Sequence, residues 1–367
     1  MKILHTSDWH LGHKFYGYDR SEEFRLVLDY LLEVIQNRQI DILLVTGDIF
    51  DAYYPPQEAL RLYYSFLVQA KNYLKNIYIL AGNHDSISNL SAPKDLLDVL
   101  DIKIISGNED VEDLIVEFDD FSLILVPYLR EFILRELYNN ENLLENLSKI
   151  YQELISKTNK KKIVTGHLTV LNSKKSQSEQ ELYIGKLEGV SPEIFYGADY
   201  VALGHLHRCQ HISPSIVYSG SILKLSFDEN DDKKLLILDT DDFSLEYVNI
   251  PQFRIIKSLE GNKEQIKHSL DYINARTQLP AFVEILLTEN ISRAEIEDLK
   301  DEFKNVRIVR YNYKTQVSEV NYEKNVKKIT PLYIFEELFQ NRDDYAALKK
   351  EFEAILDKFY LQKEQED

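Results

Sequence analysis

Five apolar runs in this chain each end in a small turn that carries a side chain able to bind metal. The runs read ILHTSDWH, ILLVTGDIFD, IYILAGNHD, KIVTGH and YVALGHLH. Such a run before a tight turn is typical of a buried strand that stops at the edge of a sheet. In α/β proteins, ligands gather outside the carboxyl ends of the strands, so these turns should face one crevice. The side chains expected to meet there are Asp8, His10, Asp48, Asn83, His84, His167, His205 and His207.

The residues between these runs predict helices that flank a sheet. Apolar residues recur at intervals of three and four over 24–35, which marks one face of an amphipathic helix that Ser21 should cap. A second helix should follow the proline pair and run over 55–75. The order strand, helix, strand, helix, strand predicts an α/β architecture. Further apolar runs over 123–238 are compatible with a second sheet.

The chain is longer than one hydrophobic core usually organises, at 367 residues. Pro251 marks the expected boundary, because the pattern after it restarts as strand, helix, strand, helix, strand. We therefore expect a catalytic domain over 1–250 and a small α+β domain over 251–320. A Lys-rich linker and two apolar-striped helices should complete the chain over 321–367.

The residue types at the five turns favour a site for two divalent metal ions. Carboxylate, amide and imidazole donors suit manganese, iron, zinc or magnesium-like ions, and manganese is favoured where oxygen and nitrogen donors mix. A lone cysteine, Cys209, provides neither a disulfide framework nor a thiolate cluster. Two ions about 3.5 to 4 Å apart can clamp the attacking and leaving oxygens of a displacement at phosphorus. One carboxylate must bridge them, and Asp48 is centrally placed in the motif order. The pattern predicts a two-metal phosphoesterase.

Taken singly, each motif also has an ordinary explanation. A DxH triplet is common by chance, and a GD pair after a strand is often only a turn. The ordered combination of GNHD, GH and GHLH behind apolar runs is far more specific. We interpret His5 and His268 as structural or solvated and place His13 at the rim of the pocket. Asp51 and Asp85 either orient an imidazole or serve a turn or cap.

The ordered motifs resemble the calcineurin-like metallophosphoesterase superfamily. The chain is most similar to the nuclease subunits of bacterial SbcCD complexes, through MKILHTSDWHLG, GDIFD, SEQELYIG, GHLHRCQ and YSGSILKLSFDE. This resemblance covers the chain end to end. It implies a metallophosphoesterase-type β-sandwich flanked by helices, a small capping domain that presents DNA, and C-terminal helices.

The resemblance also implies a role for each motif residue. One ion would be held by Asp8, His10, Asp48 and His207, and the other by Asp48, Asn83, His167 and His205. His84 would stabilise the transition state and protonate the leaving 3′ oxygen, a role that suits an imidazole. Implied further are manganese dependence, exonuclease and endonuclease activity on DNA in repair, recombination or replication, and a homodimer. The C-terminal helices would bind an ATPase partner with long coiled coils.

The net charge of −18 argues against a broad electrostatic grip on DNA by this chain alone. Bound cations would have to neutralise the carboxylates of the site, and a partner subunit would have to supply much of the contact with DNA. The densest basic stretches near the motifs either contact phosphate or form a solvated edge, and they comprise Lys160, Lys161, Lys162, Lys174 and Lys175.

The sequence has no apolar run near the roughly 20 residues of a membrane helix and no secretion signal at its start, so we expect a cytoplasmic protein without a membrane partner. Two other functions compete with the nuclease. A small-molecule phosphoesterase, for cyclic nucleotides or phosphomonoesters, would share the ligands but would not require the residues after Pro251. A scaffold without catalysis is disfavoured, because no inferred ligand is replaced by an inert residue.

Overall fold

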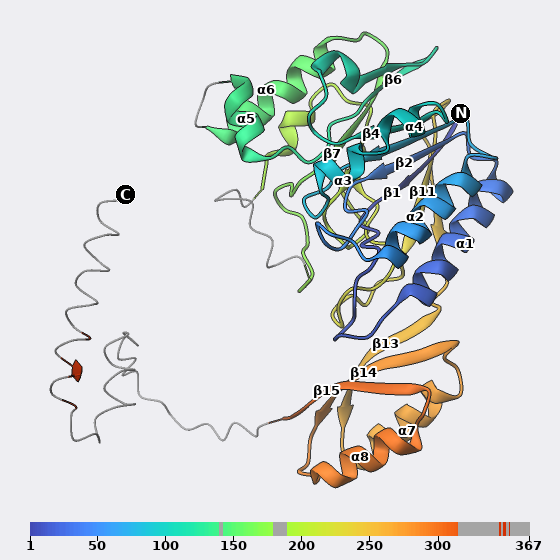
Figure 1. Ribbon diagram of the computed structural model, residues 1–367, viewed down its shortest axis with the longest axis vertical. Helices are drawn as coiled ribbons and strands as arrows, with labels where there is room; N and C mark the ends of the chain where they lie inside the picture. Colours follow the sequence, from blue (N-terminus) through green and yellow to red (C-terminus); the bar gives the residue numbers. More distant parts are fainter. Residues whose placement is uncertain (139–141, 179–188, 315–344, 346–347, 350–351, 353–367) are drawn as a thin grey trace. The chain divides into compact units, whose positions relative to one another are not determined.

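The computed structural model describes residues 1–138, 142–178 and 189–314, together with residues 345, 348, 349 and 352. Within residues 1–314 it contains two six-stranded sheets and one three-stranded sheet (Figure 1). Among the described residues, no helix combines the length and apolar character needed to cross a membrane. The predicted C-terminal helices and most of the SEQELYIG stretch lie outside the described residues.

The first sheet contains the strands predicted at the start of the chain, in the order β12-β11-β1-β2-β3-β4. Its parallel strands are β1 (Lys2–Thr6), β2 (Ile42–Thr46), β3 (Asn76–Leu80) and β4 (Ile102–Ile105). At the other side, β11 (Lys234–Asp239) and β12 (Leu245–Asn249) pair antiparallel. Because β1, β2 and β3 run in one direction, their carboxyl ends lie at the same edge.

The second sheet has the order β5-β6-β7-β8-β10-β9. Its parallel strands are β6 (Phe121–Ile124), β7 (Lys161–His167), β8 (Tyr200–Gly204) and β10 (Ile216–Tyr218). The edge strands β5 (Ile115–Glu117) and β9 (Gln210–Ser213) pair antiparallel with their neighbours. The carboxyl ends of β7 and β8 are therefore adjacent.

Strand β2 shows how the two sheets share a core. All five of its residues are buried. Leu43 and Val45 pack with the helices on one face, whereas Ile42 and Leu44 pack in the cluster that contains the second sheet. A strand covered on both faces needs apolar residues throughout, which explains the continuous run. The predicted α/β sandwich with flanking helices is confirmed.

Helices α1 (Ser21–Arg38) and α2 (Gln57–Ala70) lie together along the outer face of the first sheet (Figure 1). The second sheet packs against α6 (Leu143–Ser156). Shorter elements are α3 (Ile87–Ser91), α4 (Lys94–Asp98), α5 (Glu131–Tyr138) and the 3-10 turns Val111–Leu114 and Pro192–Phe195. The prediction that Ser21 caps α1 was wrong. Ser21 is already helical, and Asp19 accepts its backbone N–H at 3.0 Å.

The third sheet consists of β13 (Arg254–Gly261), β14 (Leu279–Leu287) and β15 (Val306–Tyr313), all parallel. Helices α7 (Lys263–Asn274) and α8 (Arg293–Glu302) connect them, and each begins with a reciprocal capping box. The predicted order of these five elements is confirmed. The domain limits at 250 and 320 stay predictions, because Met1–Lys314 forms one compact unit.

A buried ion pair network joins the third sheet to α1. The carboxylate of Glu23 accepts hydrogen bonds from Arg20 at 2.9 and 3.0 Å and from Arg254, in β13, at 2.8 Å. Next to it, Phe15 stacks on Phe282 with ring centroids 5.2 Å apart. The third sheet is thereby attached to the loop that follows the first metal-binding motif.

Candidate metal centre

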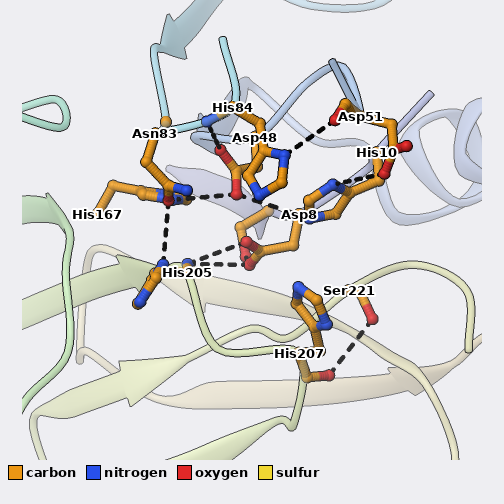
Figure 2. A network of polar contacts seen from close by, with 12 residues as sticks. Asp8, His10, Asp48, Asp51, Asn83, His84, His167, His205, His207 and Ser221 are labelled. Carbon is orange, nitrogen blue, oxygen red and sulfur yellow. Dashed lines mark hydrogen bonds and ion pairs between the residues drawn. The ribbon is translucent and has the colours of Figure 1, made fainter. Parts of the chain in front are cut away.

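The eight predicted side chains all follow, or end, strands whose carboxyl ends meet. Asp8 and His10 follow β1, Asp48 follows β2, and Asn83 and His84 follow β3. From the second sheet, His167 is the last residue of β7, and His205 and His207 follow β8. Figure 2 shows that these side chains converge from both sheets. The structure therefore brings together every residue for which the sequence predicted a place in the metal site.

Asp48 lies at the centre of the group. Its Oδ2 is 3.3 Å from Nε2 of His167 and 3.6 Å from Nε2 of His10. Its Oδ1 accepts the backbone N–H of His84 at 2.9 Å (Figure 2). The Asp48 carboxylate thus faces donors of both sheets, as a bridging ligand would have to.

Two further oxygen donors lie on either side of Asp48. Oδ1 of Asn83 is 3.0 Å from Nε2 of His167 and 3.1 Å from Nδ1 of His205. The carboxylate of Asp8 accepts the backbone N–H of His205 at 3.0 and 3.1 Å, as well as the hydroxyl of Ser7. These contacts tie the first sheet to the second across the site.

The donors fall into groups whose atoms lie within 4.8 Å of one another. The groups found among the described residues are Asp8 with His10 and His207, His10 with Asp48 and His84, and Asp48 with His167 and His205. Within this part of the chain, both ring nitrogens of His10, Oδ2 of Asp48 and Nε2 of His84 are buried without a hydrogen-bond partner. Buried polar atoms without partners are costly, and a cation would satisfy the carboxylate oxygen and any imidazole nitrogen that carries no proton. The residues present therefore fit divalent metal ions.

The electrostatics of the group are consistent with a site for cations. Burial lowers the pKa of His167, but the nearby charges of Asp48 and Asp8 raise that pKa to about 9. Burial likewise lowers the pKa of His10, whereas Asp51, Asp48 and Asp8 raise it to about 9. The pKa of Asp48 is held well below its ordinary value, because the charges of His167 and His10 outweigh the effect of burial. The carboxylates thus attract positive charge to the centre of the site.

Outer contacts fix the orientation of several imidazoles. Nδ1 of His167 lies 2.8 Å from the carbonyl of Thr46, and Nδ1 of His84 lies 2.9 Å from the carbonyl of Asp51. Because a carbonyl only accepts, both imidazoles carry a proton on Nδ1 and leave Nε2 toward the cluster. The carboxylate of Asp51 is 3.4 Å from Nδ1 of His10, so Asp51 lies against an imidazole as one of its two predicted roles requires.

Asp85 has the other predicted role, that of holding turns. Its carboxylate accepts the backbone N–H groups of Ile49, Phe50 and Gly82 at 3.1, 3.0 and 2.8 Å. Burial and the charge of Asp48 raise the pKa of Asp85 to about 6, against these hydrogen bonds. Asp85 thus connects the turn after β2 to the turn after β3.

Four site residues have left-handed backbone conformations that non-glycine residues rarely adopt. The φ angles are 51° at Asp8, 46° at His10, 52° at Asp48 and 97° at His205. Each such conformation costs of order 1 to 3 kcal/mol and persists only where surrounding contacts enforce it. The turns are therefore held in place by the packing around them.

The glycines at these turns do not all serve to permit a tight bend. Of those at 47, 82, 166 and 204, only Gly47 has a positive φ, of 100°. Gly82 instead leaves room, since a Cβ there would lie 2.1 Å from Oδ1 of Asp48. Close approach, more than backbone freedom, explains that glycine.

His5 and His268 agree with their interpretation as structural or solvated residues. His5 is buried between the hydroxyls of Tyr200 and Thr46, at 3.0 and 3.2 Å, and burial lowers its pKa to about 3. His268 is exposed on α7. His13 is half-buried beside Arg20, whose guanidinium lies 3.4 Å from its Nδ1.

The basic residues divide into two sets. Lys160, Lys161 and Lys162 lie at the start of β7, roughly 20 Å along the strand from His167. Lys160 forms an ion pair with Glu117 there, at 2.9 Å. Lys174 and Lys175 are exposed in the segment after His167, and the charge of Lys175 helps to lower the pKa of His205, after burial and the charge of His167. Only the second set lies near the cluster.

Two polar residues beside His207 were missed by the sequence analysis. Ser178 Oγ is 2.8 Å from Nδ1 of His207, and Oε1 of Glu229 is 3.6 Å from the same nitrogen. Both occur in stretches that carry the family resemblance, SEQELYIG and YSGSILKLSFDE. Their place in these two stretches could have marked Ser178 and Glu229 as candidates. Their spacing in the sequence, however, did not indicate that they contact His207.

Comparison with known proteins identifies the family. The model of the calcineurin-like phosphoesterase family matches residues 1–209. The SbcCD nuclease subunit of Escherichia coli is 33% identical over 312 residues, which cover 78% of each chain. The proteins of the same name from Staphylococcus epidermidis and Bacillus subtilis are 31% and 34% identical over 277 and 248 residues. These alignments cover 72% and 62% of this chain and 74% and 63% of the relatives. The chain therefore belongs to the calcineurin-like phosphoesterases and, within them, to the family of the SbcCD nuclease subunits, as its motifs predicted.

Proposed function

We propose that this chain is a metal-dependent DNA nuclease that hydrolyses phosphodiester bonds with two divalent ions, most favourably Mn²⁺. The observation that carries the proposal is the intact donor cluster, in a chain that is 33% identical to a nuclease over 78% of its length. Both exonuclease activity on duplex DNA and endonuclease activity on single strands belong to the proposal, with roles in repair, recombination or replication.

We assign two ligand sets by the resemblance of the motifs, and the groups around Asp48 support them. The first consists of Asp8, His10, His207 and Asp48, and the second of Asn83, His167, His205 and Asp48. The position of Oδ2 of Asp48 between His10 and His167 supports the assignment of this carboxylate to both sets. Mixed oxygen and nitrogen donors without thiolate favour Mn²⁺ over softer ions.

When bound, the ions supply positive charge that stabilises a phosphodiester under attack and activates water as a nucleophile. The protein supplies the general acid. His84 donates its Nδ1–H to the carbonyl of Asp51, so a second proton has to reside on the buried Nε2, which faces the cluster. From Nε2 it is transferred to the leaving 3′ oxygen, and neutral His84 remains held by Asp51.

The partners of the chain are also proposed. The relatives carry the name of a complex, SbcCD, of which each is one subunit. We infer that this chain acts as a homodimer with an ATPase partner from that complex, which residues 321–367 bind, on DNA in the bacterial cytoplasm. A partner that contributes basic surface would offset the net charge of −18.

The test compares Mn²⁺-dependent cleavage of end-labelled duplex DNA with cleavage of bis-p-nitrophenyl phosphate. The proteins are the wild type, His84→Gln and Asp48→Ala, each with and without the ATPase partner. His268→Gln is the matched control, because His268 is an exposed histidine on α7. Bound metal is measured in parallel.

The proposal expects the wild type and His268→Gln to cleave both substrates. His84→Gln should keep its metal and lose DNA cleavage by about 10²- to 10⁴-fold, the usual contribution of a general acid. Asp48→Ala should lose both metal and activity. If the small diester is cleaved but DNA is untouched even with the partner, the chain is a small-molecule phosphodiesterase. If neither is cleaved by a metal-loaded wild type, the scaffold interpretation replaces the nuclease.

A further inference from the structure

A chain of hydrogen bonds connects His207 to a buried carboxylate through one serine. Ser178 Oγ lies 2.8 Å from Nδ1 of His207 and 3.1 Å from Oε1 of Glu229. It also lies 2.7 Å from the hydroxyl of Ser176. Glu229 and His207 are both buried, with 5% and 2% of their surfaces exposed. Ser178 comes from the segment after β7, so the three residues meet only in the folded chain.

The direction of each hydrogen bond follows from the number of protons available. A hydroxyl donates one hydrogen bond and accepts two. Oε1 of Glu229 also accepts from the backbone N–H of Leu225 at 3.3 Å, whereas the hydroxyl of Ser226 donates to the closer carboxylate of Asp228. An ionised carboxylate has no proton to give, so the hydroxyl proton of Ser178 points to Glu229. Ser178 is then left to accept from His207 and from Ser176.

The acceptor at the end of this chain is fixed in position. Oε2 of Glu229 forms an ion pair with Nζ of Lys233. The same Nζ donates to the carbonyl of His207 at 2.8 Å and to the hydroxyl of Ser221 at 2.7 Å. Lys233 therefore attaches the carboxylate to the backbone of His207 itself. Figure 2 shows His207 beside Ser221, below the rest of the cluster.

We propose that Ser178 and Glu229 are positioning residues for metal binding, which hold the proton of His207 on Nδ1 and so direct the unprotonated Nε2 toward Asp8 and His10. This inference rests on the proposed role of His207 as a ligand. A ligating imidazole needs a bare nitrogen on the metal side, and its other nitrogen usually donates to a carboxylate or carbonyl. Here a hydroxyl lies between the imidazole and the carboxylate.

The position of Ser178 brings residues 176–178, in the described part of the segment after β7, next to the proposed ligand His207. That segment is also held by the backbone N–H of Gln177, which donates to Asp228 at 2.9 Å, next to Glu229 in the chain. Affinity at the site that contains His207 should therefore depend on this segment, whereas the site that contains His167 and Asn83 should not. The inference thus predicts a loss that is confined to one of the two ions.

The test uses the full chain and four variants, with Mn²⁺ as the probe. Ser178→Ala removes the bridging hydroxyl, Ser178→Thr keeps it, and Glu229→Gln removes the charge of the final acceptor. Ser173→Ala is the matched control, because Ser173 lies in the same segment and its hydroxyl donates to the carbonyl of Val170 at 2.7 Å. Calorimetric titration gives the affinity and number of bound Mn²⁺ ions. In metal-free protein, the imidazole ¹⁵N shifts of His207, assigned with His207→Gln, give its tautomer.

The expected result has a spectroscopic and a binding component. The wild type, Ser178→Thr and Ser173→Ala should show His207 protonated on Nδ1 and bind two ions. Ser178→Ala and Glu229→Gln should show a mixture of tautomers and lose about 10- to 100-fold in affinity at one site, the usual effect of an outer partner. A merely structural role would not change the tautomer.

Two results would overturn the inference. One is a Ser178→Ala protein that binds both ions with wild-type affinity and keeps the tautomer. The other is an equal loss in Ser173→Ala. The proposed function fails in a different way: a wild type that binds two ions with the expected tautomer, yet cleaves no DNA, refutes the nuclease and supports the positioning role.

Discussion

Replacing Asp85 should destabilise the fold around the proposed metal site, because its carboxylate holds the turns after β2 and β3. The side chain is fully buried and accepts three backbone N–H groups. In Asp85→Ala these donors lose their acceptor, at about 1 to 3 kcal/mol for each. The neutral residue also avoids the cost of a buried charge and the repulsion from Asp48, which together raise the pKa of Asp85 to about 6. We therefore expect the low end of the sum, about 3 kcal/mol.

Asp85→Asn should have a smaller effect. Its amide oxygen can replace Oδ2, which accepts from Ile49 and Gly82, while its NH₂ group would face the N–H of Phe50. One charge-assisted hydrogen bond is lost, at about 1.5 kcal/mol. The expected order of stability is wild type, Asn, Ala.

Urea unfolding followed by tryptophan fluorescence measures this order at the site itself. The chain has one tryptophan, Trp9, which is buried and lies in the sequence between the proposed ligands Asp8 and His10. Asp298→Ala, an exposed substitution on α8, is the control and should stay within about 0.5 kcal/mol of the wild type. The reasoning is refuted if Asp85→Ala also stays within that range and binds a full complement of Mn²⁺.

Three further predictions concern the same packing. Gly82→Ala should abolish metal binding, measured by calorimetry, because its Cβ would lie 2.1 Å from Oδ1 and 2.3 Å from the backbone N of Asp48; unchanged affinity would contradict the close approach. Glu23→Gln should destabilise the chain by about 3 to 5 kcal/mol, because it leaves Arg20 and Arg254 buried without their carboxylate; an unchanged unfolding midpoint would show that the network adds nothing. Removal of divalent ions should lower Tm, by the equivalent of about 2.7 kcal/mol for each ion that was present at 100 times its Kd, and thermal scans of Asp48→Ala should show no such dependence.

Much of the site could be predicted because each proposed ligand follows or ends a strand that is recognisable in the sequence as an apolar run. Buried parallel strands need continuous apolar runs, and the turn after each run is fixed to the edge of its sheet. The position of Asp48 could therefore be inferred from two features, the apolar run ILLVT and the direction of that strand. The same logic correctly placed His167 and His205 at adjacent strand ends.

Other features depend on contacts between distant residues, which no local pattern encodes. The left-handed backbone at Asp8, His10 and Asp48 is uncommon even for Asp and His, which adopt it more often than other non-glycine residues, so propensity alone would not have placed it there. The sequence did not distinguish Glu229 from the other acidic residues, because most glutamates of an acidic chain lie on its surface and contact no functional residue. The role of Gly82 was also hidden, since the atom that excludes a Cβ belongs to a residue 34 positions earlier.

The proposed metal site forms where the two sheets meet, because their contacts bring the separate loops together. Asp8, from the first sheet, accepts the backbone N–H of His205, from the second, and Asn83 lies against imidazoles of both β7 and β8. A parallel β-bridge between Ser7 and Ser221 extends these contacts between the sheets toward His207. Each proposed ligand set therefore takes donors from both sheets, so neither sheet supplies a complete set alone. Metal affinity and the packing of the sandwich should consequently change together in any variant that shifts one sheet against the other.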